Sequence, residues 1–430
     1  MKKHYTSEKN LVGILFFCLA YRIFYFEFLH PNMILYNSDS VDYFASIDVF
    51  KGIVDLYRTP VYPYILRAFE YLSKGNFIRN LFLFQQIISF FSIVLFYFIA
   101  KKTVKNKYLI ILTTIFYGCW RQLISQNVNI NPECLCIVGS TFFLFLVVKY
   151  IETPTKQIAF LIGFFPFILI MLKPIYLISL CLVFLFFIAR IVFLREKKMI
   201  YWGLLGWVIA FAGVLGYCEM NKSHHGEFVL SKIVFENSIA KVIISGAYKQ
   251  GGDQELIAVI DSTKGKGFYF STYYLNNEHM DDYSFNLKKF PSYLPPTDDM
   301  LFCKNTPNVV NYSYARMSLF VKKSQHSMVY FKYIIQRMFN ILWAFQRIFI
   351  LLFLELIILG YVFIKQNKIA WMEWLCVLFV VGQCFSILIG GIYDIGRMLI
   401  PSYPFILLLA ASFLEILVFS LRKKKLVISI

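Results

Sequence analysis

The sequence predicts an all-α polytopic membrane protein with about ten transmembrane helices. Three observations support this prediction: hydrophobic residues make up 59% of the chain, charged residues make up only 16%, and the mean hydropathy is +0.62. A soluble chain of 430 residues would expose far more charge. The same composition excludes a disordered, collagen-like or coiled-coil protein.

The predicted spans are apolar runs that match, or nearly match, the length needed to cross a bilayer, which is about 20 helical residues. They lie at 11–28, 80–100, 107–119, 133–150, 156–172, 174–194, 199–218, 337–364, 370–392 and 398–420. The third and fifth are short, as is typical of helices that line a cavity. The first run follows a lysine-containing start without a small-residue cleavage site, so we expect a retained span.

The distribution of charge predicts the orientation of these spans. Alternate connections together hold 19 Lys and Arg residues but only 3 Asp and Glu residues; they are 1–10, 101–107, 149–157, 190–198, 365–368 and 421–430. Because Lys and Arg beside spans collect on the cytoplasmic side, both termini are expected in the cytoplasm and the other connections outside. The net charge of +18 therefore reflects topology, and no nucleic-acid partner is expected.

Two outward connections are too long to be simple turns. The first, 29–79, belongs to an N-terminal transmembrane module of residues 1–218 and contains a polar stretch. Within it, 41–51 and 60–72 are expected to form short helices lying along the membrane interface.

The second long connection covers residues 219–333 and contains paired glycines and several prolines. We expect it to form a small extracytoplasmic subdomain. Residues 311–325 should form a helix that leads back to a C-terminal transmembrane module at 334–430.

Acidic side chains beside the first span are the leading candidates for function, because polar groups at a membrane are costly. Asp39 and Asp42 follow that span in a Ser-rich stretch. Either carboxylate could accept a proton or cap a helix that begins near residue 41, and the two roles are compatible.

Two basic residues are candidates for binding an anion. Arg58 lies among tyrosines and prolines, a setting that suits bidentate phosphate recognition, although it could instead pair with Asp55. Lys173 interrupts an apolar run from 158 to 189, so it either binds an anion or extends to the interface.

Three further charged residues have both a structural and a functional interpretation. Glu133 opens a predicted span, where the helix dipole favours a carboxylate for structural reasons alone. Asp394 and Arg397 precede the last span and could form a simple surface ion pair.

Several kinds of chemistry have no motif in this chain. The sequence contains no P-loop, no Gly-rich dinucleotide turn, no Gly-x-Ser-x-Gly and no His-Glu-x-x-His. The histidines at 224–225 and 279 lack a third metal ligand at a recognised spacing and are expected in solvated loops. No cofactor is identified, and a divalent metal is left open.

The order of these motifs resembles that of the GT-C glycosyltransferases, most closely bacterial relatives of protein O-mannosyltransferases and aminoarabinose lipid A transferases. The resemblance covers roughly residues 11–420 and is carried by Asp39-Ser40-Val41-Asp42-Tyr43, Arg58-Thr59-Pro60-Val61-Tyr62-Pro63, Gln85-Gln86, Pro132-Glu133, Lys173-Pro174, and Arg397 with Pro401 and Pro404. The chain departs from the family at Ser40, where some members have a second carboxylate, and at Lys173, where the family usually has Arg.

The resemblance implies roles for individual residues. Asp39 would be the catalytic base, with Asp42 and Glu133 as supporting or acceptor-positioning carboxylates. The donor phosphate would be bound by Arg58, Lys173 and Arg397. The cavity would be lined by Tyr43, Tyr62 and Asp394.

The function implied by the resemblance is transfer of a sugar from a polyprenyl-phosphate donor, with inversion, to a lipid, glycan or protein acceptor. Such an enzyme would lie among the lipids of a bacterial cytoplasmic membrane, with its active site facing the periplasm or exterior. The alternative is a transporter or flippase, in which the same charges would bind a lipid-linked or anionic substrate without cleaving a bond.

Overall fold

A computed structural model of the chain describes residues 2–29, 43, 58–73, 76–194, 197–231, 233–263, 314–344, 346–366, 371–390 and 398–428. These residues are mostly helical, with no strand among them, and the chain is therefore an all-α membrane protein. It divides into two compact units: unit 1 comprises Met1–Ser231, Phe345–Ile389 and Asp394–Ile430, and unit 2 comprises Lys232–Ala344 and Gly390–Tyr393.

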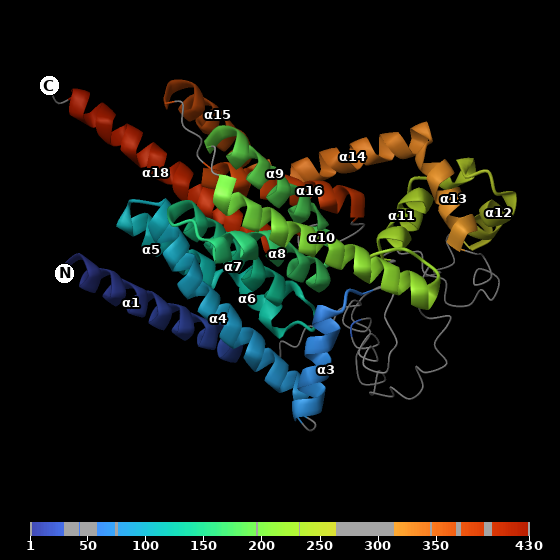
Figure 1. Cartoon of the computed structure of the whole chain (residues 1–430), viewed down its shortest axis with the longest axis horizontal. Helices are drawn as coiled ribbons and strands as arrows, with labels where there is room; N and C mark the ends of the chain where they lie inside the picture. Colours follow the sequence, from blue (N-terminus) through green and yellow to red (C-terminus); the bar gives the residue numbers. More distant parts are fainter. Residues whose placement is uncertain are drawn as a thin grey trace. The chain divides into compact units, whose positions relative to one another are not determined.

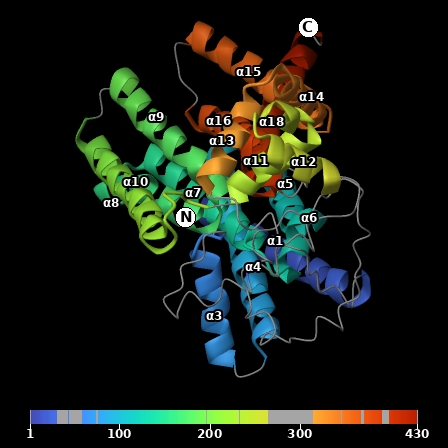
Figure 2. The same cartoon turned by 90° about the vertical axis from the view of Figure 1, so that its right-hand side faces the viewer.

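Unit 1 holds the long apolar helices (Figure 1). They are α1 (Lys2–Phe24) with the π-helical turn η1 (Tyr25–Leu29), α3 (Val61–Ser73), α4 (Phe77–Thr103), α5 (Lys107–Cys119), α6 (Arg121–Ser125), η3 (Gln126–Val128), α7 (Glu133–Glu152), α8 (Lys156–Leu172), η4 (Pro174–Tyr176), α9 (Leu177–Leu194), α10 (Lys197–His225), α15 (Gln346–Gln366), α16 (Trp371–Gly390), η9 (Ile400–Ser402) and α18 (Tyr403–Ile428). Figure 2 shows α8, α9 and α10 as neighbours, and each contacts the other two.

Within the described ranges, seven helices are long and apolar enough, by length and composition, to cross a membrane. They lie at Lys9–Phe28, Phe77–Thr103, Glu133–Glu152, Pro174–Phe193, Met199–His224, Trp371–Leu388 and Ile400–Val418. The prediction of ten spans is not confirmed. Helices α5 and α8 have only 13 and 17 residues. The apolar run at 337–364 is divided between two helices of different units, a boundary that hydropathy does not reveal.

Helices α8 and α10 approach each other at the distance of backbone contact. A Cβ atom on Gly163 would lie 2.0 Å from the Gly203 carbonyl oxygen, and one on Gly206 would lie 2.2 Å from the Phe160 carbonyl oxygen. Glycine at membrane-helix contacts allows this approach. The short helix α8 is therefore held along its length by α10.

The long connection predicted at 29–79 contains α3, whose bounds, Val61–Ser73, lie within one residue of the helix predicted at 60–72. The outward side of this connection and the placement of the helix at the interface stay predictions. Helix α3 begins directly after Pro60, a residue that is favoured just before or at a helix start. It buries Tyr62, Pro63 and Leu66 and contacts α4 and α8. The helix predicted at 41–51 lies outside the described residues except for Tyr43.

Unit 2 is a small helical cluster with its own apolar core. Its helices are α11 (Ile233–Ile244), η5 (Ala247–Gln250), α12 (Gln254–Thr263), α13 (Tyr314–Gln325) and α14 (Met328–Ala344). Val242, Leu256 and Phe320 belong to that core, which joins α11, α12 and α13. The Tyr248 hydroxyl donates to the Asp261 carboxylate at 2.5 Å.

Substituting a glycine at the contact of α8 with α10 should destabilise the protein. We expect Gly206→Ala to lower the melting temperature in detergent, because overpacking costs about 1–3 kcal/mol. Gly216 lies on the same helix with no atom within 4 Å of an added Cβ. Gly216→Ala is thus the matched control and should preserve or slightly raise the melting temperature. Equal melting temperatures of Gly206→Ala and Gly216→Ala would contradict the close approach of α8 to α10.

Unit 2 contains a fully buried lysine whose protonation should make stability depend on pH. Burial, with the charge of Arg337, lowers the pKa of Lys241 from 10.5 to about 7. Between these values the unfolded chain binds a proton that the folded chain does not, so stability rises with pH. We expect the melting temperature of the natural protein, relative to that of Lys241→Met, to increase from pH 7 to 10. A constant difference would contradict the lowered pKa.

Candidate functional site

The structure brings part of the predicted site together in unit 1, near the start of α7. The predicted residues that it describes are Tyr43, Arg58, Tyr62, Glu133 and Lys173. They form two groups: Lys173 pairs with Glu133, and Arg58, Tyr43 and Tyr62 pack together. Gln85 connects Tyr62 to the backbone just before α7. The remaining predicted residues lie outside the described ranges; they are Asp39, Asp42, Asp394 and Arg397.

A buried ion pair joins Lys173 to the first residue of α7. Lys173 leaves the helical conformation, with φ −156° and ψ 122°, because the proline that follows it disfavours the helical region. Its ammonium donates to Oε1 of Glu133 at 2.8 Å, and the two side chains are 14% and 1% exposed. Lys173 thus pairs inside the protein, contrary to the alternative in which it extends to the interface.

Gln85 of α4 holds the segment before α7 in place. Its amide nitrogen donates to the backbone carbonyls of Asn127 at 3.0 Å and Asn129 at 3.1 Å. Its amide oxygen accepts a hydrogen bond from the Tyr62 hydroxyl at 3.4 Å. Because Gln85 is fully buried, these bonds satisfy a polar group that would otherwise be costly to bury. They connect α3 and α4 to the segment 126–132 that precedes α7, which we call the α7 entrance.

Arg58 lies against two tyrosines. Its guanidinium is 4.7 Å from the centre of the Tyr43 ring, and that ring meets the Tyr62 ring edge-on at 5.1 Å. Such cation–π contacts favour an arginine in a partly dehydrated position. Burial raises the pKa of Tyr62 well above its usual range, with the nearby Tyr43 and Glu133 adding to the effect, so its hydroxyl stays neutral.

Three asparagines before α7 carry amide atoms that have no hydrogen-bond partner among the described residues. They are Oδ1 of Asn127, Oδ1 of Asn129 and Nδ2 of Asn131. These side chains are only 1%, 5% and 0% exposed. A buried polar atom left unpaired costs about 1–3 kcal/mol, so this set of two acceptors and one donor indicates polar partners such as hydroxyl groups or water.

No known family matches this chain. Neither a protein-family model nor a curated protein nor a solved structure is similar enough to match it. The resemblance to GT-C glycosyltransferases therefore stays a prediction, and the function is inferred from the side chains of the cluster.

Arg22 was not among the predicted site residues, although it lies inside the first apolar run. It is 5% exposed, and its guanidinium donates to the Gly118 carbonyl at 3.1 Å and to the Ser89 hydroxyl at 3.3 Å. It thereby joins α1 to α4 and α5. A basic residue within a predicted span is the signal that would have identified it.

Two other buried polar residues also escaped prediction from the sequence. Glu355 of α15 and Gln383 of α16 are 1% and 0% exposed, and within the described part of the chain their side-chain oxygen and nitrogen atoms have no hydrogen-bond partner. Glu355 is also near enough to Glu373 for the two charges to repel. Ionisable and amide groups in such positions often mark ion or substrate pathways.

The requirement for a metal stays as open as the sequence leaves it. Across the described ranges, no group of three or more His, Cys, Asp or Glu side chains could hold a metal ion. The predicted acidic pair, Asp39 and Asp42, lies outside those ranges.

The buried ion pair yields a stability prediction. Glu133→Gln and Lys173→Met should each lower stability by about 3–5 kcal/mol, because each leaves the other charge buried. The double variant should lose less than the sum of the two. The exposed Lys102–Glu152 pair is the matched control, and Lys102→Met should cost about 1 kcal/mol or less. Thermal melting of all four variants tests this, and additive losses at Glu133 and Lys173 would contradict it.

Proposed function

We propose that this chain is an integral membrane glycosyltransferase. It moves a sugar from a polyprenyl-phosphate donor to an extracytoplasmic acceptor and inverts the anomeric configuration. The observation that carries the proposal is the cluster at the start of α7, which combines cations, tyrosines and buried amide atoms that have no partner among the described residues. A sugar linked to a lipid phosphate presents the complementary groups, namely an anion and several hydroxyls.

The cations of the cluster suit the leaving group. As the bond between the anomeric carbon and the phosphate oxygen breaks, negative charge grows on the lipid phosphate, and fixed cations stabilise that transition state. Lys173 has three N–H donors, of which the Glu133 contact uses one. Glu133 would thus orient the ammonium while leaving donors for the phosphate. Arg58 would supply a second charge, and Arg397 is expected to add a third.

The asparagine amides suit the sugar. Asn127 and Asn129 each offer an amide oxygen that accepts, and Asn131 offers an amide nitrogen that donates. A sugar hydroxyl both donates and accepts, so two or three hydroxyls would satisfy all of these atoms. This match favours a carbohydrate over a simple lipid phosphate, which has no sugar ring with hydroxyl groups.

The base of the proposed reaction is Asp39. The acceptor oxygen or nitrogen forms a bond to the anomeric carbon, its proton passes to the Asp39 carboxylate, and polyprenyl phosphate leaves with the electrons of the broken bond. Asp42 would position the acceptor. Tyr43, which packs against Arg58, follows Asp39 by four residues, so the chain can extend at most about 14 Å between them.

The proposed location is a bacterial cytoplasmic membrane, with both termini in the cytoplasm and the cluster on the periplasmic or outer side. The distribution of Lys and Arg supports this orientation, because the basic connections alternate with those that carry the cluster. The acceptor is then a lipid, glycan or protein of the cell envelope.

A transporter or flippase of a lipid-linked anionic substrate is the second candidate. The specific observation in its favour is Glu355, a buried carboxylate on an apolar helix that has no hydrogen-bond partner among the residues that the structure describes. Transporters use such groups to carry protons or ions. Glycosyl transfer has no need of a carboxylate at that position.

Mass spectrometry of envelope lipids, glycans and glycoproteins from a deletion strain tests the proposal. The deletion should accumulate a polyprenyl-linked sugar and lose one modification. Asp39→Asn should fail to restore that modification while the purified variant still folds and binds the donor. Lys102→Met, which alters an exposed ion pair, should restore it and serves as the matched control.

Two outcomes would contradict glycosyl transfer. The first is an unchanged envelope profile under conditions in which the protein is expressed. The second is restoration by Asp39→Asn combined with loss of function in Glu355→Gln, which is the result expected of a transporter.

A further inference from the structure

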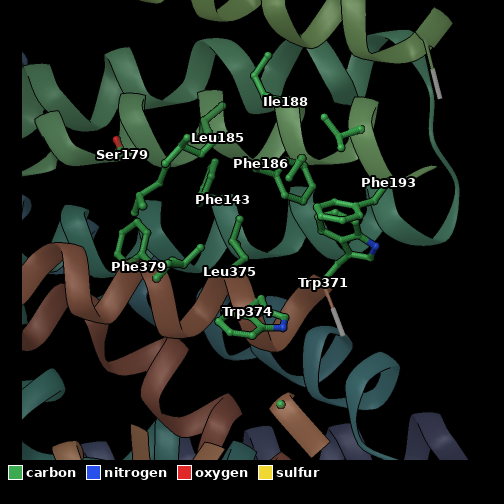
Figure 3. A pocket seen from close by; sticks show the side chains of 16 residues that line it. Phe143, Ser179, Leu185, Phe186, Ile188, Phe193, Trp371, Trp374, Leu375 and Phe379 are labelled. Atoms are coloured by element: carbon green, nitrogen blue, oxygen red, sulfur yellow. The ribbon is translucent and has the colours of Figure 1, made fainter. Parts of the chain in front are cut away.

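Unit 1 contains an apolar cavity that the proposed reaction does not use. Its volume is about 550 Å³, and it lies among α7, α9, α15 and α16 (Figure 3). Apart from two tryptophan indoles, Ser179 provides the only polar side chain among the lining residues, and its hydroxyl donates to the Tyr176 carbonyl at 2.5 Å. The lining therefore offers a ligand apolar contact and almost no hydrogen bonding.

One end of this cavity carries a fixed positive charge. Figure 3 shows Trp371 and Phe193 together at that end. The Arg190 guanidinium lies 5.0 Å from the Tyr150 ring centre, 5.7 Å from that of Phe186 and 5.6 Å from that of Trp371. Phe186 and Trp371 also line the cavity, so two of the three rings that contact the guanidinium form its wall and separate the charge from the cavity.

The opposite end is apolar. Phe379 lies there in Figure 3, and its ring stacks on that of Phe405 at 3.9 Å. A ligand that fills the cavity thus has an apolar body toward Phe379 and an anionic end toward Arg190. The sequence adds to this polarity, because residues 190–198 contain four basic residues and one acidic residue.

The charged end of the cavity is far from the polar cluster. Arg190 follows Lys173 by 17 residues, almost all of them helical, which corresponds to roughly 25 Å. A molecule whose headgroup lies beside Arg190 is therefore distinct from a donor whose phosphate lies beside Lys173. By the predicted orientation, that headgroup belongs to the cytoplasmic leaflet.

We propose that this cavity binds one acyl chain of an anionic phospholipid, whose headgroup lies at the Arg190 end. A single buried chain holds a lipid only marginally, and stable binding takes a second, electrostatic interaction. Arg190, whose guanidinium lies 5.6 Å from the Trp371 ring centre, supplies that interaction, because anionic headgroups are attracted to a fixed cation. The bound chain fills the space between α9 and α16 and so stabilises unit 1.

Lipid binding by the purified full-length protein tests this proposal. Phospholipids retained after detergent extraction are identified by mass spectrometry. Melting temperatures are then measured after addition of phosphatidylglycerol or of phosphatidylcholine with the same acyl chains. Ala189→Trp places a large side chain in the cavity, whereas Ile209→Trp adds the same side chain at an exposed apolar position of α10 and is the matched control.

We expect the natural protein and Ile209→Trp to retain phosphatidylglycerol, and to melt at a higher temperature with it than with phosphatidylcholine. Ala189→Trp should lose most of the retained lipid, several-fold, while remaining monodisperse. Arg190→Gln should respond equally to both lipids. Undiminished retention by Ala189→Trp, or equal responses of the natural protein to both lipids, would overturn the proposal.

A third outcome separates this site from the donor site. Selective loss of polyprenyl phosphate from Ala189→Trp, with phosphatidylglycerol retained, would assign the cavity to the donor and also overturn the proposal. Sugar transfer is not needed for any of these measurements, so they stand or fall independently of the proposed enzyme activity.

Discussion

A lysine ammonium and a glutamate carboxylate, 2.8 Å apart and largely removed from water, form the interaction on which the polar cluster depends. Neither charge is stable alone in such surroundings. Lys173 reaches its partner because the chain leaves the helical conformation before a proline, and Glu133 is available because α7 begins with it. The end of one helix and the start of another are thereby fixed together.

The ion pair can be kept in this position only because polar groups of the backbone around it also have hydrogen-bond partners. Non-helical backbone at the depth of a membrane is tolerated where it is buried in protein or lines a cavity. Gln85 meets this requirement by donating to the carbonyls of Asn127 and Asn129. The glycine contacts of α8 with α10 fix a helix of 17 residues that ends directly before Lys173 of the ion pair.

Two cations, Lys173 just before η4 and Arg190 near the end of α9, are held by different physical means. Lys173 is fixed by a carboxylate and retains donors that suit a phosphate in a polar setting. Arg190 is fixed by three aromatic rings beside an apolar cavity, which suits the boundary between a lipid chain and its headgroup. The proposed sugar transfer and the proposed lipid binding therefore rest on separate cations, one before the start of α9 and one near its end.

The sequence by itself determined the helical membrane class and most of the helix positions. It also singled out Glu133 and Lys173 as charged side chains whose place beside apolar runs calls for an explanation. These are local properties, since apolar length, proline position and charge among apolar residues are read along the chain. Only the tertiary structure decided that Glu133 pairs with Lys173, that Gln85 joins α3 to the α7 entrance, and that the run at 337–364 belongs to two helices. Hydropathy carries no information on which helices touch, because every apolar face is equally compatible with lipid or with another helix.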